Sequence, residues 1–542
     1  MYYTKIINYF SNLHIRLKKV FMSEKWDTLV VGAGIGGLTA AAKLVQSGQK
    51  VLVVDKNPHP GGTTAFYYRK GFAFPMGPLG FSSPALVQKI LKDLEVETQL
   101  RLRRVHYRFR AFDLDIPLSL PFSDMVEELG TFFPSDREGI KQFFNNMGEI
   151  TAAQKVSASN LNHHRAQKVP QTSASDYIGK LIRDPGLRRI LGSIGTREPY
   201  TSLPLLAAMW DLIAQQGIWY PAEGMQLLAE GLVKAVNRDV VLQRDDGHGE
   251  IRLNEEVAEI RVKDNSALGV ILKGGRQIDA DAVISNADYK NTFLRLLGPK
   301  VVPRAWYHAV STGRQTGSLF QVCLGIDVQK VDLSAFPEVA LWPKEVETII
   351  YRRGLGEAVV NWEAREIDPQ ALASQELEVS LRVGNEKAIV VIRVEAEHRH
   401  FARFRSVTTS RRWPFGQRIP EYQEYKTRLG RALVHEIGSL IPGLEQAICV
   451  MDIATPLTFE DQGSRSEGAV AGWSWDYEDS GDDQPKELIR TPFTGLYMAG
   501  YQAFSALFTG GVPTAMESGI RAAQAVLDGA GPIETIKIPG GR

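Results

Sequence analysis

Residues 28–55 read TLVVGAGIGGLTAAAKLVQSGQKVLVVD, and this stretch decides the fold. The apolar run 28–31 predicts a buried parallel strand, and a G-x-G-x-x-G pattern follows it directly. Apolar residues at helical spacing then predict a helix that ends at Gly48. The run 51–54 predicts a second strand, which stops at Asp55. A strand, a glycine-rich turn, a helix and a strand ending in an acid predict a Rossmann-type dinucleotide-binding unit.

Each part of the glycine-rich pattern has a mechanical reason. Gly32 permits a tight turn, Gly34 lets the backbone approach a pyrophosphate, and Gly37 lets the helix pack on the strand. The helix N-terminus offers unpaired N–H groups and a partial positive charge to the same pyrophosphate. Asp55 lies about 20 residues further on, where a carboxylate accepts hydrogen bonds from ribose hydroxyls; it disfavours NADP but leaves NAD and FAD open. The predicted contacts are Gly32, Ala33, Gly34, Ile35, Gly36, Gly37, Asp55 and Lys56.

Composition and motif content exclude several classes of protein. The 542 residues include 63 Lys and Arg against 62 Asp and Glu, a balance that argues against a dedicated nucleic-acid binder. Two cysteines cannot build a disulfide framework or a four-cysteine metal site. The sequence has no G-x-S-x-G, no P-loop and no H-E-x-x-H pattern. It therefore lacks the motifs typical of nucleophile-elbow hydrolases, P-loop enzymes and zincins. No metal is predicted.

Further stretches resemble a single family when taken in order along the chain. They are NPHPGGTT (57–64), WYPAEGMQLL (219–228), ADAVISNAD (280–288), LYMAG (496–500) and GGVP (510–513). Together they resemble the phytoene desaturase, carotenoid isomerase and retinol saturase family of amine-oxidase-like flavoproteins, over about residues 26–528. The resemblance implies that the dinucleotide is FAD. It also implies further FAD contacts at Gly61, Gly62, Thr63, Val257, Gly500, Gly511, Val512 and Pro513.

Two positions depart from the pattern of the family that the sequence resembles. Many relatives have an arginine directly after the glycine pair, where this chain has Thr63. Many flavoproteins have Gly-Asp in the closing motif, whereas here Gly500 is followed by Tyr501 and Gln502. Both changes are expected to weaken FAD binding without removing the backbone contacts. The helix predicted to begin near Val512 is expected to aim its positive end at the ligand and to stabilise a reduced, anionic flavin.

The fold class predicted from these features is α/β. A Rossmann-type FAD-binding domain is split into residues 24–100, 217–297 and 485–530. The insertions 101–216 and 298–484 are expected to form a mixed α+β substrate domain, mostly helical in the first insertion and strand-rich around 319–324 and 388–392. Residues 1–23 are read as a separate N-terminal segment and 531–542 as a tail.

Several other features have two readings. Residues 1–21 form either a basic amphipathic helix on a membrane surface or a disordered leader. The basic run 101–110 is either a patch for acidic groups or a solvated strand face. His398 and His400 are expected on an exposed strand edge, with a metal as the less favoured alternative. Cys323 is expected in the core. The uncharged stretch 491–516 is interrupted by glycines and a proline and is not read as a membrane helix.

The activity implied by the resemblance is hydride transfer between flavin and a C–C or C=C bond of an apolar polyene or isoprenoid lipid. Desaturation, saturation and isomerisation stay open, and no acid or base is assigned. The alternatives are a flavin amine oxidase and a prenyl-lipid-binding module without redox chemistry. A cytoplasmic protein, peripheral on a membrane if it meets lipid, is expected. Its electron partner and oligomeric state are open.

Overall fold

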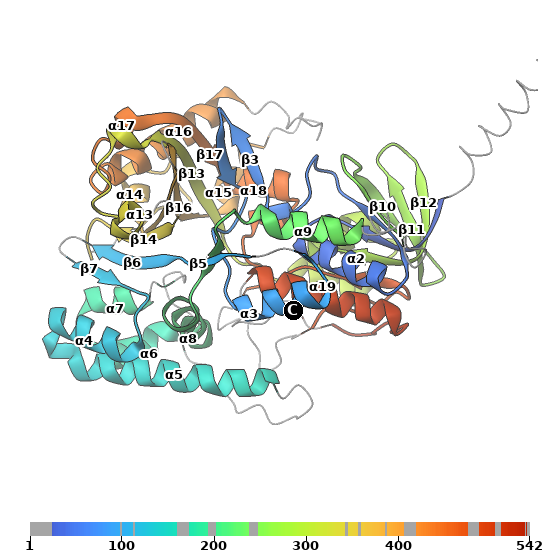
Figure 1. Cartoon of the computed structure of the whole chain (residues 1–542), viewed down its shortest axis with the longest axis horizontal. Coiled ribbons are helices and arrows are strands. Elements are labelled where there is room, and N and C mark those ends of the chain that lie inside the picture. Colours follow the sequence, from blue (N-terminus) through green and yellow to red (C-terminus); the bar gives the residue numbers. More distant parts are fainter. Residues whose placement is uncertain are drawn as a thin grey trace, which may run out of the picture.

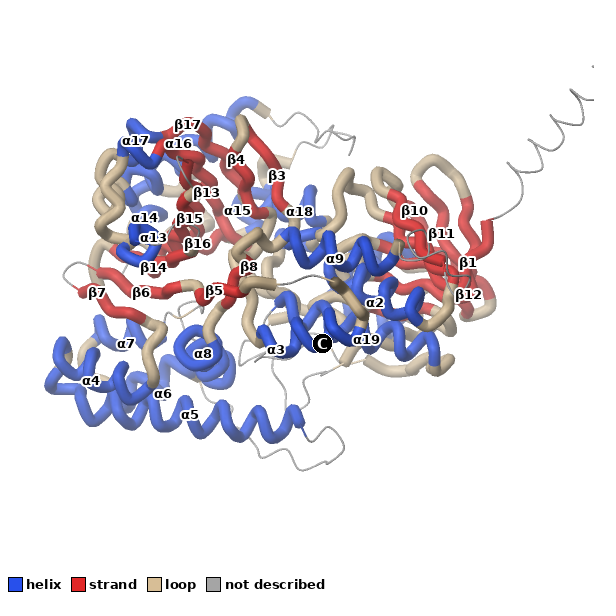
Figure 2. The backbone as a smooth tube through the Cα atoms, viewed as in Figure 1, coloured by secondary structure: helices blue, strands red, loops and turns tan. Residues whose placement is uncertain are grey.

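Two β-sheets organise the chain into two lobes (Figure 1). The computed structural model describes residues 24–97, 100–111, 114–159, 173–192, 194, 202–237, 248–341, 345–355, 359–384, 387–405, 419–474, 487–504, 511–536 and 538. The predictions for residues 1–21 and for Gly510, and part of the uncharged stretch 491–516, lie outside this part of the chain. Figure 2 shows the strands of each lobe gathered together, with helices beside them.

The first sheet combines three distant parts of the sequence. Its order is β10 (Val257–Lys263), β11 (Ser266–Leu272), β12 (Gln277–Ser285), β1 (Glu24–Val31), β2 (Lys50–Val54) and β9 (His248–Arg252), with β18 (Leu496–Met498) beside β12. Strand β1 runs parallel to both β12 and β2, and β2 runs parallel to β9. The carboxyl ends of β1, β2 and β12 therefore meet at one edge, where doubly wound sheets bind ligands.

Three helices pack together beside this sheet (Figure 1). They are α2 (Ile35–Gln46), α9 (Gln226–Val236) and α19 (Gly511–Leu527), with α2 in contact with both of the others. The first ten helical positions of α2 are nearly all buried, since the alanines and glycines there permit close approach from both sides. Strands at 28–31 and 51–54, the helix between them and a helix beginning near Val512 are thus confirmed.

The second sheet contains the strands of the two insertions. Its order is β17 (Ile448–Ala454), β13 (Ser318–Asp327), β16 (Lys387–Ala396), β15 (Leu377–Val383), β14 (Val346–Arg352), β6 (His106–Ala111) and β7 (Leu114–Pro117). An apolar core formed by residues of β13, β15 and β16 includes side chains of α14 (Pro369–Ala373), α16 (Pro420–Ile437) and α17 (Leu444–Ala447). Another core joins β6 and β14 to α4 (Phe122–Phe132), α5 (Arg137–Ser159), α6 (Ala174–Leu181), α7 (Pro185–Gly192) and α8 (Leu203–Trp210).

Some segments pack across the sequence boundaries that were expected between domains. In the hairpin of β3 (Phe66–Arg69) and β4 (Phe72–Pro75), Phe72 and Phe74 pack against Cys323 of the second sheet. Helix α12 (Arg304–Thr312) contributes Trp306 to the core of the first lobe, although it follows position 298. Cys323 is 1% exposed, so its expected core location is confirmed.

The expectation for the two histidines is wrong about their local structure. Strand β16 ends at Ala396, and His398 and His400 lie in a short helix, α15 (His398–Ala402). The helix turns His400 into the core, where Nε2 lies 2.7 Å from the Tyr425 hydroxyl and Nδ1 lies 3.0 Å from the Trp362 carbonyl oxygen. Packing against the aromatic side chains outweighs the local strand pattern.

The basic run is held by partners within the chain. Arg101 pairs with Glu223, Arg103 with Glu345, and Arg108 with Asp115. Arg104, in β5 (Leu102–Arg104), donates to the carbonyl of Ala214 at 2.7 Å, next to the short pairing of β5 with β8 (Trp219–Pro221). These charges fasten strands and loops to one another.

Candidate functional site

The first two glycine motifs meet through their backbones. Gly32 N–H donates to the Val54 carbonyl at 2.8 Å, which places the turn at the end of β2. Gly61 N–H donates to the Ala33 carbonyl at 2.8 Å, and Gly61 forms an isolated parallel bridge with Gly34. Gly61 and Gly62 have φ values of 107° and 56°, which favour glycine. The predicted contacts at 32–37 and 61–62 are thus adjacent in space.

The start of α2 is free of protein side-chain caps. Gly34 occupies the N-cap position without a side-chain hydrogen bond, and the first turn of α2 contains no acidic residue. The first N–H groups of a helix lack partners within the helix and carry its positive end. Gly32, Gly34, Ile35 and Gly36 line a large cavity, so this end is directed at a space that accommodates an anionic ligand.

Backbone N–H groups of the neighbouring loops hold the Asp55 carboxylate in position. Its Oδ2 accepts the Ala33 N–H at 2.7 Å, and its Oδ1 accepts the Asn57 N–H at 2.8 Å. The residue is 8% exposed and lines the cavity. Each carboxylate oxygen has two lone pairs, so both retain capacity to accept from ribose hydroxyls.

Lys56 has a different environment from its neighbour. Its Nζ donates to the Asp461 carbonyl at 3.2 Å and to the Ser464 hydroxyl, in and next to α18 (Pro456–Gly463). Burial lowers the pKa of this lysine. Although Lys56 lines the cavity, its ammonium is engaged in fastening β2 of the first sheet to the second lobe.

The closing motif lies against the glycine-rich loop. Ala499 N–H donates to the Ser285 carbonyl at 2.9 Å, and Gly500 N–H donates to the Ser518 hydroxyl of α19 at 2.7 Å. A Cβ on Gly36 would lie 2.8 Å from the Ala515 carbonyl oxygen and 3.1 Å from Gly500 N. Helix α19 therefore begins beside α2, and both helix N-termini belong to the same region.

The predicted contacts divide by their place in the wall of the cavity. Those that line it are Gly32, Gly34, Ile35, Gly36, Asp55, Lys56, Gly62, Thr63, Val257, Gly500, Gly511 and Val512. Ala33, Gly37, Gly61 and Pro513 are not among the lining residues. Gly37 is packed behind the wall, since a Cβ there would lie 2.2 Å from the Gly32 carbonyl oxygen.

Asn286 was not predicted as a site residue, although it belongs to the quoted ADAVISNAD stretch. It follows β12 at the carboxyl end of the sheet, and its Nδ2 lies 3.4 Å from the Gly32 carbonyl oxygen. A Cβ on Gly34 would lie 2.8 Å from Asn286 Nδ2. The position of Asn286 one residue beyond a central parallel strand was the signal that could have identified it.

Gln502 lies in the closing motif, two residues after Gly500. Its Oε1 accepts the Tyr289 N–H at 2.7 Å, while its buried Nε2 has no hydrogen-bond partner in the described part of the chain. Gln502 is 5% exposed and lines the cavity. A buried donor without a partner suits a ligand oxygen. At the glycine loops no side chain prevents a ligand from approaching the backbone. These loops and the Gln502 donor together fit a flavin dinucleotide.

We call the glycine-rich wall formed by residues 32, 34–36, 62 and 500 the glycine cradle. A single cavity of about 3120 Å³ joins the glycine cradle to the second lobe. Part of its wall is apolar, from Leu205 and Met209 of α8, Leu212 of η3 (Asp211–Gln216) and Ile350 of β14. The volume is more than a dinucleotide needs, so space for a second molecule remains beside the cradle.

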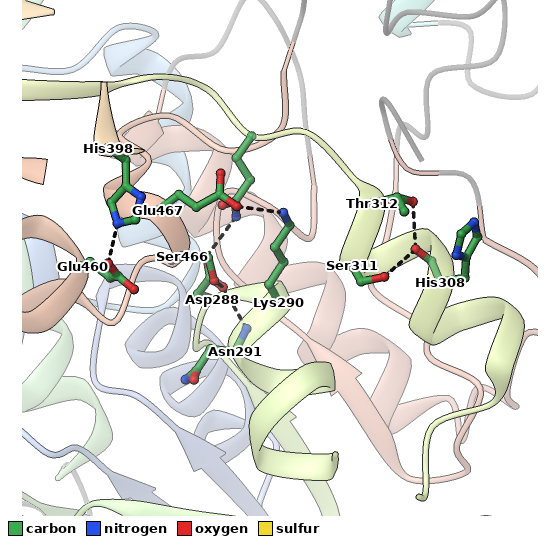
Figure 3. A network of polar contacts seen from close by, with 11 residues as sticks. Asp288, Lys290, Asn291, His308, Ser311, Thr312, His398, Glu460, Ser466 and Glu467 are labelled. Atoms are coloured by element: carbon green, nitrogen blue, oxygen red, sulfur yellow. Dashed lines mark hydrogen bonds and ion pairs between the residues drawn. The ribbon is translucent and has the colours of Figure 1, made fainter. Parts of the chain in front are cut away.

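Polar side chains hold the loops between the cradle and the second lobe (Figure 3). Asp288 Oδ1 accepts from Asn291 N–H at 2.9 Å and from the Ser466 hydroxyl at 2.6 Å. Lys290 Nζ lies 3.5 Å from Glu467 Oε1, and Lys290 is 8% exposed and lines the cavity. The Glu467 carboxylate thus offsets the charge of this ammonium.

His398 also belongs to this polar wall (Figure 3). Its Nε2 lies 2.6 Å from Glu460 Oε2, and Arg405 pairs with the same carboxylate. Among the described residues no group of three or more His, Cys, Asp or Glu side chains is arranged to hold a metal ion. In the same part of the chain no helix has the length and apolarity to cross a membrane.

Comparisons with known proteins give a consistent family. The model of the family described as "Flavin containing amine oxidoreductase" matches residues 35–382. Prolycopene isomerase 1, chloroplastic, from an Oncidium hybrid cultivar is 26% identical over 522 residues, covering 90% of this chain and 81% of that protein. The lycopene-forming phytoene desaturase of Pseudescherichia vulneris is 26% identical over 319 residues, covering 55% and 63%.

A solved structure has the same fold. The crystal structure of an oxidoreductase from Methanosarcina mazei aligns with a TM-score of 0.59 and 18% identity, covering 92% of this chain and all of that one. At this identity the likeness concerns the fold alone, and it includes both lobes.

Proposed function

Because the chain belongs to the family of flavin containing amine oxidoreductases, we propose that it is an FAD-dependent oxidoreductase that acts on an apolar polyene or isoprenoid lipid. The family and the α/β fold predicted from the motifs are confirmed. The observation that carries the substrate proposal is the single cavity, which joins the glycine cradle to the apolar wall of α8 and β14. Relatives named for prolycopene and phytoene support a conjugated or conjugatable chain.

The residues proposed to hold FAD are those that the three motifs bring together. The first N–H groups of α2 and the glycine approach at Gly34 and Gly62 suit the pyrophosphate, and Asp55 suits the adenosine ribose. Asn286 and Gln502 join this set because their amide groups face the same region. The start of α19 adds positive charge that favours a reduced, anionic flavin.

Bound FAD supplies hydride acceptance and donation at a C–C or C=C bond. The chain contributes orientation and exclusion of water, through the apolar wall that holds an extended lipid alongside the cradle. Hydride and proton removal gives desaturation, their addition gives saturation, and a transient transfer gives isomerisation. Asp288 accepts hydrogen bonds from Asn291 and Ser466, which keeps these loops in place beside the cavity.

The first experiment is an absorption spectrum of the purified protein before and after loading with FAD and desalting. A retained flavin spectrum is expected, and its absence after loading would contradict FAD binding. Anaerobic incubation of oxidised and of reduced holoenzyme with acyclic polyenes is then expected to change the flavin spectrum or the polyene chromophore. Oxidation of primary amines without any effect on polyenes would favour the amine oxidase alternative.

We also propose contact with a lipid surface at the mouth of the cavity. Val359 and Ile419 line the cavity and are 76% and 38% exposed. Exposed apolar side chains at the entrance of a lipid site suit a membrane surface from which the substrate enters. The double variant V359D/I419D is expected to float less with anionic liposomes than the parent protein. Unchanged flotation would contradict this contact.

A further inference from the structure

Two arginines face the cavity from the second sheet, and they differ in how many of their nitrogens find an acceptor in the described part of the chain. Arg393 of β16 donates to Gln321 at 2.9 Å, to Glu378 at 2.6 Å and to the Gly77 carbonyl at 2.8 Å. Each of its three guanidinium nitrogens thus donates to one acceptor. Arg352 at the end of β14 lines the same cavity but differs from Arg393 in its hydrogen bonding.

The guanidinium of Arg352 has an unused donor. The side chain is 7% exposed, and its buried Nη1 has no hydrogen-bond partner in the described part of the chain. The Glu376 carboxylate lies beside it, with Oε2 4.0 Å from Nε. That separation is longer than a hydrogen bond but short enough for the charges to balance. A buried donor left in this state is unusual in a native structure.

Arg352 lies beside the apolar part of the cavity. Side chains two residues apart on a strand share a face, so Arg352 lies on the same face as Ile350. Ile350 packs in the core with Leu206 of α8 and lines the cavity together with Leu205 and Met209. An apolar passage with one unpaired donor in its wall suits a long apolar molecule that carries one acceptor.

We propose that Arg352 recognises an uncharged oxygen, a carbonyl or a hydroxyl, at one end of the polyene substrate. This proposal rests on the proposed function and narrows its substrate class to oxygenated polyenes. Arg352 Nη1 donates to the oxygen, while the apolar chain extends along the wall of α8 and β14. A pure hydrocarbon in the same passage leaves Nη1 without a partner.

The opposite charges of Arg352 and Glu376 favour a ligand with an uncharged end group over one with a carboxylate. Glu376 already offsets the charge of Arg352, so a carboxylate bound to Nη1 would add a second negative charge beside Glu376. The carbonyl or hydroxyl oxygen of a neutral ligand accepts without that repulsion. A terminal carbonyl offers the best geometry because its lone pairs lie in the plane of the group.

The test compares polyenes that differ only at one end. Oxidised holoenzyme is titrated with an acyclic polyene hydrocarbon and with its terminal alcohol, aldehyde and carboxylate of equal chain length. Dissociation constants are read from quenching of tryptophan fluorescence. The aldehyde is expected to bind at least about tenfold more tightly than the hydrocarbon, the loss that one unpaired buried donor implies.

The variant R352M is expected to remove the preference for the aldehyde while retaining hydrocarbon binding. R352M/E376Q is the second variant, because it removes the Glu376 carboxylate together with the guanidinium beside it. R431M removes an exposed arginine of α16 and serves as the matched control, with the parental preference unchanged. Flavin content and melting temperature are measured for each variant, so that loss of fold is separated from loss of recognition.

The outcomes separate the inference from the function on which it rests. Equal dissociation constants for hydrocarbon and aldehyde in the parent protein would overturn the role of Arg352 but leave the oxidoreductase proposal in place. Tighter binding of the carboxylate than of the aldehyde would overturn the selection of an uncharged group. Binding of none of the polyenes, with FAD retained, would overturn both proposals.

Discussion

A side chain at position 34 would occupy the space between the backbone and the expected pyrophosphate. A Cβ there would lie 2.8 Å from Asn286 Nδ2, the end of a side chain that can move aside. The cost to the fold is therefore small, whereas the cost to a pyrophosphate approaching the backbone is not. A substitution at Gly34 is therefore expected to affect cofactor binding more than it affects folding.

We expect G34A to weaken FAD binding by at least about tenfold, a loss of roughly 1.4 kcal/mol, with little change in melting temperature. The measurement is the flavin retained after desalting, together with thermal unfolding of the FAD-free protein. G148A in α5 is the matched control, because a Cβ there has no neighbour within 4 Å. Full FAD retention by G34A would contradict the predicted pyrophosphate position.

Glu347 of β14 is a buried acid with an incomplete set of partners. It is 0% exposed, and its Oε2 accepts the Glu338 N–H at 3.1 Å, while its Oε1 has no hydrogen-bond partner in the described part of the chain. Burial raises the pKa of Glu347 to about 7. The native state therefore holds this proton more tightly than the unfolded chain does.

The stability contributed by the protonated Glu347 is fully present below about pH 4.5 and declines as pH rises toward 7. We expect E347Q, which keeps the side chain uncharged, to be more stable than the parent at pH 8 by about 3 kcal/mol and equal to it near pH 4.5. Denaturant unfolding at several pH values measures this difference. A difference that does not vary between pH 4.5 and 8 would contradict the raised pKa.

At the scale of elements, contact between α2 and α19 brings the beginning and the end of the chain together. A Cβ on Gly519 of α19 would lie 2.3 Å from the Gly36 carbonyl oxygen and 3.0 Å from Ala40 N. Both are backbone atoms that cannot rotate away. The close approach of these helices therefore depends on a position without a side chain.

We expect G519A to lower the free energy of unfolding by about 1–3 kcal/mol, because the helices must separate. The displacement also moves Gly500 and the start of α19, so FAD retention is expected to fall. G179A in α6 is the matched control, since a Cβ there has no neighbour within 4 Å. A melting temperature of G519A equal to that of the parent would contradict the helix contact.

At the scale of the whole molecule, polar contacts and one hairpin hold the lobes around the cavity. Lys56 reaches α18, Arg393 reaches the Gly77 carbonyl, and Phe72 and Phe74 pack against Cys323. These contacts form between segments far apart in sequence. They set the width of the space between the glycine cradle and the apolar wall.

We expect R393M to lower the free energy of unfolding by about 1–3 kcal/mol, because Gln321, Glu378 and the Gly77 carbonyl lose a shared donor. The double variant R393M/E378M is expected to recover part of this loss, since it removes the carboxylate left without a partner. Denaturant unfolding measures both. Parental stability in R393M would contradict a structural role for this contact.

The local pattern of residues 28–55 was sufficient to predict β1, α2, β2 and the glycine turn. Strand and helix periodicities act over a few residues, and the positive φ values of the turn require glycine in the sequence itself. The motifs of the resemblance, taken in their order along the chain, also identified the family. The expectation for His398 and His400 was wrong because packing, which is nonlocal, decides between a short helix and a strand edge.

Only the tertiary structure decided which of these residues stand together and what else faces the cavity. Asn286, Gln502 and Arg352 acquire their significance from neighbours more than 20 residues away in sequence, such as Gly32, Tyr289 and Glu376. Lys56 shows the converse, since its position beside Asp55 suggested the cofactor while its ammonium binds α18. The sequence by itself determined the cradle, because backbone conformation is local; the fold determined the cavity, because burial and unpaired donors arise only when distant segments pack.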